Sequence, residues 1–209
     1  MKVTIFGATG RTGRYLVEQA VAAGYHVTAF TRSPHKLDAH RDRIEIVEGN
    51  VQDAAAVEEA VAGADAVLSV LGPTENAPDY QIARGTGHIV EAMAKHGVQR
   101  LIISAGAGVS DPNDEPTLLN KLINVLLSLF SRHVYEDMKR TVALVRASDV
   151  AWTIVRVPRL VDGDASGDIK AGHVGKGMGM SLRRGDLAAF MLQQLQSDAY
   201  LRRAPAISN

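Results

Sequence analysis

A glycine-rich segment close to the first residue has the residue types and the spacing of a phosphate-binding turn. It reads Gly7-Ala8-Thr9-Gly10-Arg11-Thr12-Gly13, follows an apolar run at 3–6 and opens a helical pattern. Glycine lets the chain reverse sharply, and the N–H groups and positive end of the following helix attract a pyrophosphate. Because strand, turn and helix occur in the order this motif requires, the sequence predicts a dinucleotide site. The alternative is a structural turn without a ligand.

The end of the second apolar run selects the kind of dinucleotide. An NAD site usually carries an acidic residue about 20 residues beyond the glycines, but here Arg32 stands in that region and the first acidic residue downstream is Asp38. An arginine offers a planar fork of donors to a 2′-phosphate, with Ser33, His35 or Lys36 as further donors. We therefore expect NADPH rather than NADH. The alternative is that Arg32 only stacks on the adenine, which leaves either cofactor acceptable.

Short apolar runs that alternate with helical patterns would position these residues. The runs are strand-length and rich in β-branched residues, as in strands buried on both faces of a parallel sheet: 3–6, 27–30, 44–47, 66–70, 101–103 and 152–155. Helical patterns cover 12–23, 53–62, 79–96 and 116–147, and glycines follow the first three of them. Repeated βα units predict an α/β fold, a single-domain doubly wound parallel sheet (Rossmann fold) over residues 1–209.

Two irregular segments, 106–116 and 161–180, follow predicted strands on the side where open α/β sheets bind ligands. The second contains six glycines. We expect both to be substrate-side loops, the second of them mobile.

The composition of the chain excludes several classes of protein. The 209 residues suit one domain, and 23 basic against 23 acidic residues leave no basic field for nucleic acid. Without cysteine there is no disulfide or thiolate chemistry, and the scattered histidines have no nearby carboxylate cluster, so we expect no metal. The first apolar run is too short for a signal peptide, and no run approaches the roughly 20 residues that span a bilayer. We expect a cytoplasmic protein that binds no membrane.

These motifs resemble those of the atypical short-chain dehydrogenase/reductases. The resemblance rests on the glycine turn, Thr31-Arg32-Ser33, Gly49-Asn50-Val51-Gln52-Asp53, Leu71-Gly72 and Thr153-Ile154-Val155-Arg156, and it extends over nearly the whole chain. Within this superfamily the chain is most similar to the NADPH-dependent flavin reductase/biliverdin-IX β reductase group and its bacterial NAD(P)H-binding relatives.

The resemblance implies roles for residues along a cofactor path. Gly7, Thr9, Gly10, Arg11 and Thr12 would wrap the pyrophosphate. Arg32, His35 and Lys36 would hold the 2′-phosphate, and Asn50 and Val51 would lie against the adenine. Leu71, Gly72 and Ile82 would line the path to the nicotinamide, whose ring Ser104, Pro158 and Leu160 would flank.

Two departures from the family pattern argue against biliverdin as the natural substrate. Biliverdin-reducing relatives carry a histidine after the proline that follows the sixth strand, where this chain has Arg159. They also carry a serine two residues beyond the position of Ser104, where this chain has Gly106. A planar flavin or quinone needs little more than stacking beside the nicotinamide, and a flavin would then be a substrate rather than a bound cofactor.

Tyr135 and Lys139 form the YxxxK pair that many short-chain dehydrogenases use. Residues four apart share a helix face, and the lysine would lower the pKa of the tyrosine that donates a proton. With Ser104 they would complete a catalytic set, although the gap between Ser104 and Tyr135 is long for that pattern. The alternative places Tyr135 at the surface and pairs Lys139 with Glu136. Hydride delivery to a flavin needs no such set, because the cofactor carries the chemistry and the protein fixes distance and face.

The stretch from Leu118 to Phe130 is apolar over more than one helix face. Such a helix must be buried somewhere: in the core, at a subunit contact or as a lid over a hydrophobic substrate. A domain of this size has limited room for it, so we favour a homodimer.

Three functional hypotheses follow. The first is an NADPH-dependent oxidoreductase that transfers hydride to a flavin, quinone or similar planar acceptor. The second is a carbonyl reductase that uses Ser104, Tyr135 and Lys139. The third is a non-catalytic regulator that senses NADP(H); such regulators usually have longer C-terminal regions.

Overall fold

An eight-stranded, mostly parallel sheet forms the centre of the computed structural model, which describes residues 1–73, 76–118, 122, 125–126, 129–175 and 177–209. The strands run in the order β3-β2-β1-β4-β5-β6-β10-β8, and only β8 is antiparallel to its neighbour. Their bounds are β1 Lys2–Phe6, β2 His26–Thr31, β3 Glu45–Glu48, β4 Ala66–Ser69, β5 Arg100–Gly106, β6 Ala151–Val157, β8 Lys170–Gly172 and β10 Ala206–Ser208. A separate two-stranded ribbon pairs β7 (Arg159–Val161) with β9 (Ser181–Arg183).

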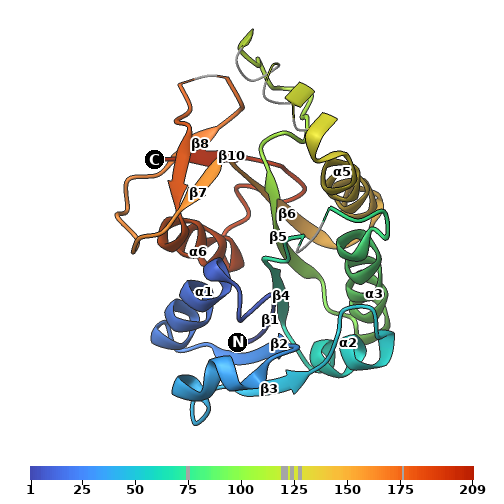
Figure 1. Ribbon diagram of the computed structural model, residues 1–209. Helices are drawn as coiled ribbons and strands as arrows, with labels where there is room; N and C mark the ends of the chain where they lie inside the picture. Colours follow the sequence, from blue (N-terminus) through green and yellow to red (C-terminus); the bar gives the residue numbers. More distant parts are fainter. Residues whose placement is uncertain (74–75, 119–121, 123–124, 127–128, 176) are drawn as a thin grey trace.

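Helices cover both faces of the sheet (Figure 1). On one side lie α1 (Arg11–Ala22) and α6 (Arg184–Gln193), and on the other α2 (Ala54–Val61), α3 (Gln81–His96) and α5 (Arg132–Ala147). Two 3₁₀ turns, η1 (Pro34–His40) and η2 (Gln194–Gln196), complete these elements. The strand order 3-2-1-4-5-6 with helices on both faces is that of the doubly wound Rossmann fold, so the predicted fold class is confirmed.

The core consists of two apolar layers that the sheet separates. Ile5 and Leu16 belong to the layer under α1 and α6, whereas Phe6 and Ile89 belong to the layer under α2 and α3. Successive residues of β1 therefore point to opposite faces and both are buried. This explains why the strand sequences are apolar without polar alternation.

The predicted helical stretch 116–147 differs from the structure. A bend at Ser131 precedes α5, and residues 119–121, 123–124 and 127–128 of that stretch lie outside the described residues. The described apolar side chains before the bend are exposed by 44 to 84%: Leu118, Leu122, Val125, Leu126, Leu129 and Phe130. They are thus not part of the core of this chain, and the subunit contact and the substrate lid stay predictions. Among the described residues, no helix is long and apolar enough to cross a bilayer.

Candidate functional site

The glycine turn lies between β1 and α1, as predicted. Gly7 has a φ of 80°, and a Cβ there would lie 2.9 Å from the carbonyl oxygen of Val70 just beyond β4. Gly13 also has to lack a side chain, because its Cβ would lie 2.0 Å from the carbonyl oxygen of Gly7. Gly10 begins α1, and no side chain caps the N–H groups of its first turn. These donors are available to a pyrophosphate, which fits a dinucleotide at this turn.

The end of β2 lies directly beside this turn. The hydroxyl oxygens of Thr9 and Thr31 are 3.1 Å apart and share a hydrogen bond. Arg32 and Lys36 follow on an exposed segment, and both contribute to the lining of a pocket of about 290 Å³. Neither side chain forms an ion pair with another described residue, so both charges are available to a phosphate group.

A second pocket of about 470 Å³ extends the first toward the carboxyl ends of β5 and β6. The two pockets share a wall made of Gly10, Val70, Leu71, Gly72, Pro73, Ile82, Val134 and Asp137, so they form one cleft. The cleft lies at the ends of β1 and β4, where the strand order reverses and doubly wound folds bind ligands. Its two parts are of the size usual for small-molecule sites, roughly 300–1,000 Å³.

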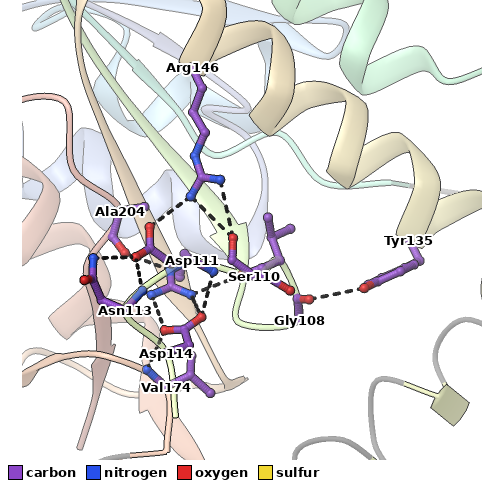
Figure 2. Close-up of polar contacts among 11 residues, drawn as sticks. Gly108, Ser110, Asp111, Asn113, Asp114, Tyr135, Arg146, Val174 and Ala204 are labelled. Carbon is purple, nitrogen blue, oxygen red and sulfur yellow. Dashed lines mark hydrogen bonds and ion pairs between the residues drawn. The ribbon is translucent and has the colours of Figure 1, made fainter. Parts of the chain in front are cut away.

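One face of α5 lines the second pocket. This face consists of Val134, Asp137, Met138 and Thr141, which follow the i, i+3, i+4, i+7 spacing of a helix stripe. Tyr135 and Lys139 lie on the neighbouring face and line neither described pocket. The Tyr135 hydroxyl donates to the carbonyl oxygen of Gly108 over 3.4 Å (Figure 2), and the Lys139 ammonium lies 3.2 Å from the Glu136 carboxylate.

Asp137 is a buried carboxylate that connects α5 to α3. Its two oxygens accept from the backbone N–H groups of Ile82 over 3.1 Å and of Ala83 over 2.8 Å, at the start of α3. In return, the Asn76 side-chain oxygen accepts from the N–H groups of His133 and Val134 at the start of α5. The start of α3 is therefore capped from α5, and the start of α5 from the loop that precedes α3, which fixes the wall that both pockets share.

A charged bridge lies across the cleft beside the glycine turn. The carboxylate of Asp162, which follows β7, receives Arg11 on one oxygen and Arg184 on the other, the second at 3.1 Å. The hydrogen bond from Arg11, with the charges of Arg184 and Arg14, holds the pKa of Asp162 below its ordinary value. Both Arg11 and Arg184 line the second pocket, so the bridge holds two cations at the cleft beside the glycine turn.

The structure brings most of the predicted cofactor residues to this cleft. Those in its lining are Gly7, Thr9, Gly10, Arg11, Thr12, Arg32, Lys36, Asn50, Val51, Leu71, Gly72, Ile82, Ser104 and Leu160. His35 and Pro158 line neither described pocket. Among the described residues no group of histidines and carboxylates could hold a metal ion.

Sequence reasoning missed Asp137 and Arg184. The helix stripe on α5 was readable from residue spacing, because it needs only the three- and four-residue steps from Val134. Arg184 offered no comparable signal, since it reaches the cleft only through the folding of the last quarter of the chain.

Comparison with known proteins matches residues 7–198 to a family described as NAD(P)H-binding. Among curated proteins, the oxidoreductase AgnL4 of Paecilomyces divaricatus is 26% identical over 188 residues, which are 81% of this chain and 69% of that protein. The chain covers less than two thirds of several other curated reductases and oxidoreductases that match.

Solved structures share the whole fold. A short-chain dehydrogenase/reductase from Veillonella parvula in complex with NADP superimposes with a TM-score of 0.82 at 20% identity, over 100% of this chain and 94% of that one. ChuY of Escherichia coli O157:H7, described as an anaerobilin reductase, gives a TM-score of 0.79 at 20% identity over 100% and 97%.

Proposed function

The chain belongs to the NAD(P)H-binding family, and from this premise we propose that it uses NADPH to reduce a flavin, a quinone or a similar planar acceptor. The class is the broader statement: the chain is an NAD(P)H-dependent oxidoreductase, as its family and the oxidoreductases among its relatives indicate. The choice of NADPH and the kind of acceptor are the proposal.

The lining of the second pocket is the observation that supports a planar acceptor. Its walls come mainly from small and apolar side chains, among them Leu71, Ile82, Met138 and Leu160. The lining contains no tyrosine, lysine or histidine among the described residues. A flat ring gains dispersion and hydrophobic contact in such a slot without a dedicated proton donor. A carbonyl acceptor would need that donor, because it develops an alkoxide.

The choice of NADPH rests on Arg32 and Lys36. Both are exposed on the first pocket and neither forms an ion pair with the described residues. A 2′-phosphate would give each a charge-assisted hydrogen bond. The uncapped first turn of α1 would hold the pyrophosphate with Arg11 and Arg184. This leaves the second pocket for the nicotinamide and the acceptor.

The residues of this chain would orient the rings and exclude water between them. Bound NADPH would supply the hydride and leave as NADP⁺, while the acceptor takes its proton from solvent at the mouth of the cleft. Asp137 is not the donor in this scheme, since both of its oxygens accept backbone hydrogen bonds.

An acceptor panel with NADPH tests the proposal. The expected result is loss of nicotinamide absorbance with FMN or with a quinone such as menadione. Turnover confined to simple ketones would favour a carbonyl reductase instead. Tight NADPH binding without turnover on any acceptor would favour a regulator and contradict the proposal.

A further inference from the structure

Two loops beyond the cleft meet at one carboxylate. The Asp114 side chain lies in the loop after β5, and its Oδ1 accepts from the backbone N–H of Val174, which follows β8 in the 161–180 segment, over 2.9 Å (Figure 2). Its Oδ2 accepts from the backbone N–H of Asp111 over 2.8 Å and so also shapes its own loop. The side chain is 8% exposed, so these bonds are protected from water. One side chain thus holds the 106–116 loop and the 161–180 loop together.

Arg156 anchors this carboxylate to the sheet. The residue is fully buried on β6, and its Nη1 and Nη2 donate to the two Asp114 oxygens over 2.5 and 2.8 Å. Its remaining contacts are with backbone: Nε donates to the Ala204 carbonyl and Nη1 to that of Val109. A guanidinium without water has to be paired with a carboxylate, and a two-bond fork is the geometry that fits. The pair therefore gives the loops a fixed position relative to the sheet.

Hydrogen bonds and the charge of Arg156 keep Asp114 ionised in spite of its burial. Burial alone would raise the pKa of the Asp114 carboxyl, but hydrogen bonds from Arg156 and from the N–H groups of Asp111 and Val174 together hold it below its ordinary value. The carboxylate is thus charged at neutral pH and keeps all of these contacts.

A second, uncharged contact joins the same two loops. The Glu115 N–H donates to the Val174 carbonyl over 3.0 Å. Directly after it, Gly175 has a φ of 97°, and a Cβ on it would lie 1.8 Å from the Glu115 carbonyl oxygen. The backbones touch here, so that no side chain fits between them. The contact between the loops is therefore continuous, from Asp114 to Pro116 in the first loop and over Val174 and Gly175 in the second.

Both loops start on the wall of the second pocket. Gly106 lines it, and its N–H donates to the Met138 sulfur over 3.1 Å, on the helix face that also lines the pocket. Leu160, which also lines the pocket, directly precedes the 161–180 loop. A change in how the loops meet would thus reach the place where the acceptor has to lie.

We propose that Asp114 is a positioning residue for the acceptor: by joining the 106–116 and 161–180 loops to buried Arg156, it sets the shape of the acceptor side of the cleft. The proposal deepens the proposed function and rests on it. Asp114 touches neither pocket, and so it acts on the acceptor only through the loops. It should leave the binding of the dinucleotide unchanged.

Two pairs of variants test this role. Asp114→Asn removes the charge and one of the acceptor oxygens. Its control is Asp111→Asn, because Asp111 lies in the same loop and pairs with Arg146 on α5 without reaching the second loop. Gly175→Ala separates the loops and leaves the ion pair intact. Its control is Gly177→Ala, a position with a φ of 65° where a Cβ would meet nothing within 4 Å.

Three measurements are made on each variant: KM and kcat for FMN at saturating NADPH, NADPH affinity by calorimetry, and hydrogen–deuterium exchange of peptides from 161–180. Asp114→Asn and Gly175→Ala should raise the KM for FMN about tenfold, because the loops no longer hold the acceptor side of the cleft in shape. The kcat should fall as well, since misplacement of a bound substrate by about 1 Å can lower rates by about a hundredfold. NADPH affinity should stay unchanged, and exchange in 161–180 should become faster. Both controls should match the unaltered protein.

An unchanged KM for FMN in Gly175→Ala, or an equal rise in the controls, would overturn the proposal. If Asp114→Asn does not fold, Gly175→Ala decides by the same criteria. If the unaltered protein oxidises NADPH with neither FMN nor menadione, the proposed function fails, and the acceptor role of Asp114 fails with it. If the unaltered protein turns over FMN but exchange in 161–180 is unchanged in both Asp114→Asn and Gly175→Ala, the coupling of the loops is contradicted and the proposed function is not.

Discussion

At the scale of residues, our proposal that the cleft prefers NADPH depends on single side chains. Arg32 stands at the end of β2, where an acidic residue would be expected for NADH, and it is exposed on the first pocket. The residue type was sufficient for this prediction, because the position of the second strand end follows from the sequence pattern alone.

Arg32→Ala should weaken NADPH binding far more than NADH binding. Loss of one charge-assisted contact corresponds to roughly 1.5–3 kcal/mol, or about 10- to 150-fold in affinity. Calorimetric titration with both nucleotides measures the difference. The control is Arg41→Ala, which removes an exposed arginine that pairs with Asp38 and lines neither described pocket. Equal affinity of the unaltered protein for NADPH and NADH would contradict this reading of Arg32.

Residue type and spacing were not sufficient to predict which other residues line or shape the cleft, because their positions depend on the tertiary structure. The sequence draws attention to Tyr135 and Lys139 because their spacing matches a known pair. The second pocket, however, is lined by the neighbouring face of the same helix, which begins at Val134. The buried pair of Asp114 and Arg156 joins positions 42 residues apart. No local pattern could have indicated it.

At the scale of elements, the strands and most helices of the first three quarters of the chain could be predicted, apart from η1 and the bend at Ser131, but the elements of the last quarter could not. Most residues of α6 are buried on all sides, so the helix lacks the polar stripe that makes a helical period visible. The strands β7, β8, β9 and β10 have three residues each, too few to establish a period of two. The six glycines in 161–180 predict a mobile loop, but Gly175 has to be glycine because its backbone packs directly against that of Glu115.

Substitutions at two glycines of the turn should have different effects, one on nucleotide binding and the other on stability. Gly10 has an ordinary φ of −70°, and a Cβ there would lie 3.1 Å from the Gly7 carbonyl oxygen, a close contact that a small backbone shift relieves. Gly10→Val should therefore keep the fold and block binding of both nucleotides by occupying the approach to the first turn of α1. Gly13→Ala should instead destabilise the protein by roughly 1–3 kcal/mol, because its Cβ would overlap the Gly7 carbonyl. Calorimetry and thermal unfolding distinguish the two effects. Retained nucleotide binding by Gly10→Val would show that the dinucleotide lies elsewhere.

Asp186 should make stability depend on pH at the junction of α6 and the 161–180 loop. It is fully buried and accepts from Ser166, Gly167 and Asn209. Burial would raise the pKa of Asp186, but these hydrogen bonds together lower it. A lowered pKa in the folded state means that the stabilisation is present at neutral pH and is lost as pH falls below about 4, the value in the unfolded chain.

Asp186→Asn should therefore be less stable at pH 7 by roughly 1–3 kcal/mol, with a shallower loss of stability below pH of about 4. Urea unfolding across that range measures both effects. Asp164→Asn, on an exposed position of the same loop, is the control and should follow the unaltered protein. An acid limb as steep in Asp186→Asn as in the unaltered protein would contradict the assignment.

At the scale of the whole molecule, one cleft runs along the carboxyl ends of the strands from Arg32 to Leu160. Polar and charged groups gather at its first end and on the Asp162 bridge, whereas the second pocket is largely apolar. In the proposed binding mode, the phosphates and the reacting ring would therefore lie in different surroundings. Folds of this class bind dinucleotides at the same point of strand reversal, which is why the sequence alone could predict residues that the structure brings to one cleft.

The most direct test of this account measures NADPH oxidation with FMN by the unaltered protein and by Tyr135→Phe. The substitution keeps the ring and removes only the hydroxyl, which bonds to Gly108 outside both described pockets. The account predicts turnover by the unaltered protein and most of that turnover in the variant, because a planar acceptor needs no positioned acid. Such an acid typically contributes about 10²–10⁴-fold in rate. A loss of about a hundredfold or more with NADPH affinity unchanged would contradict the account and make Ser104, Tyr135 and Lys139 the catalytic set.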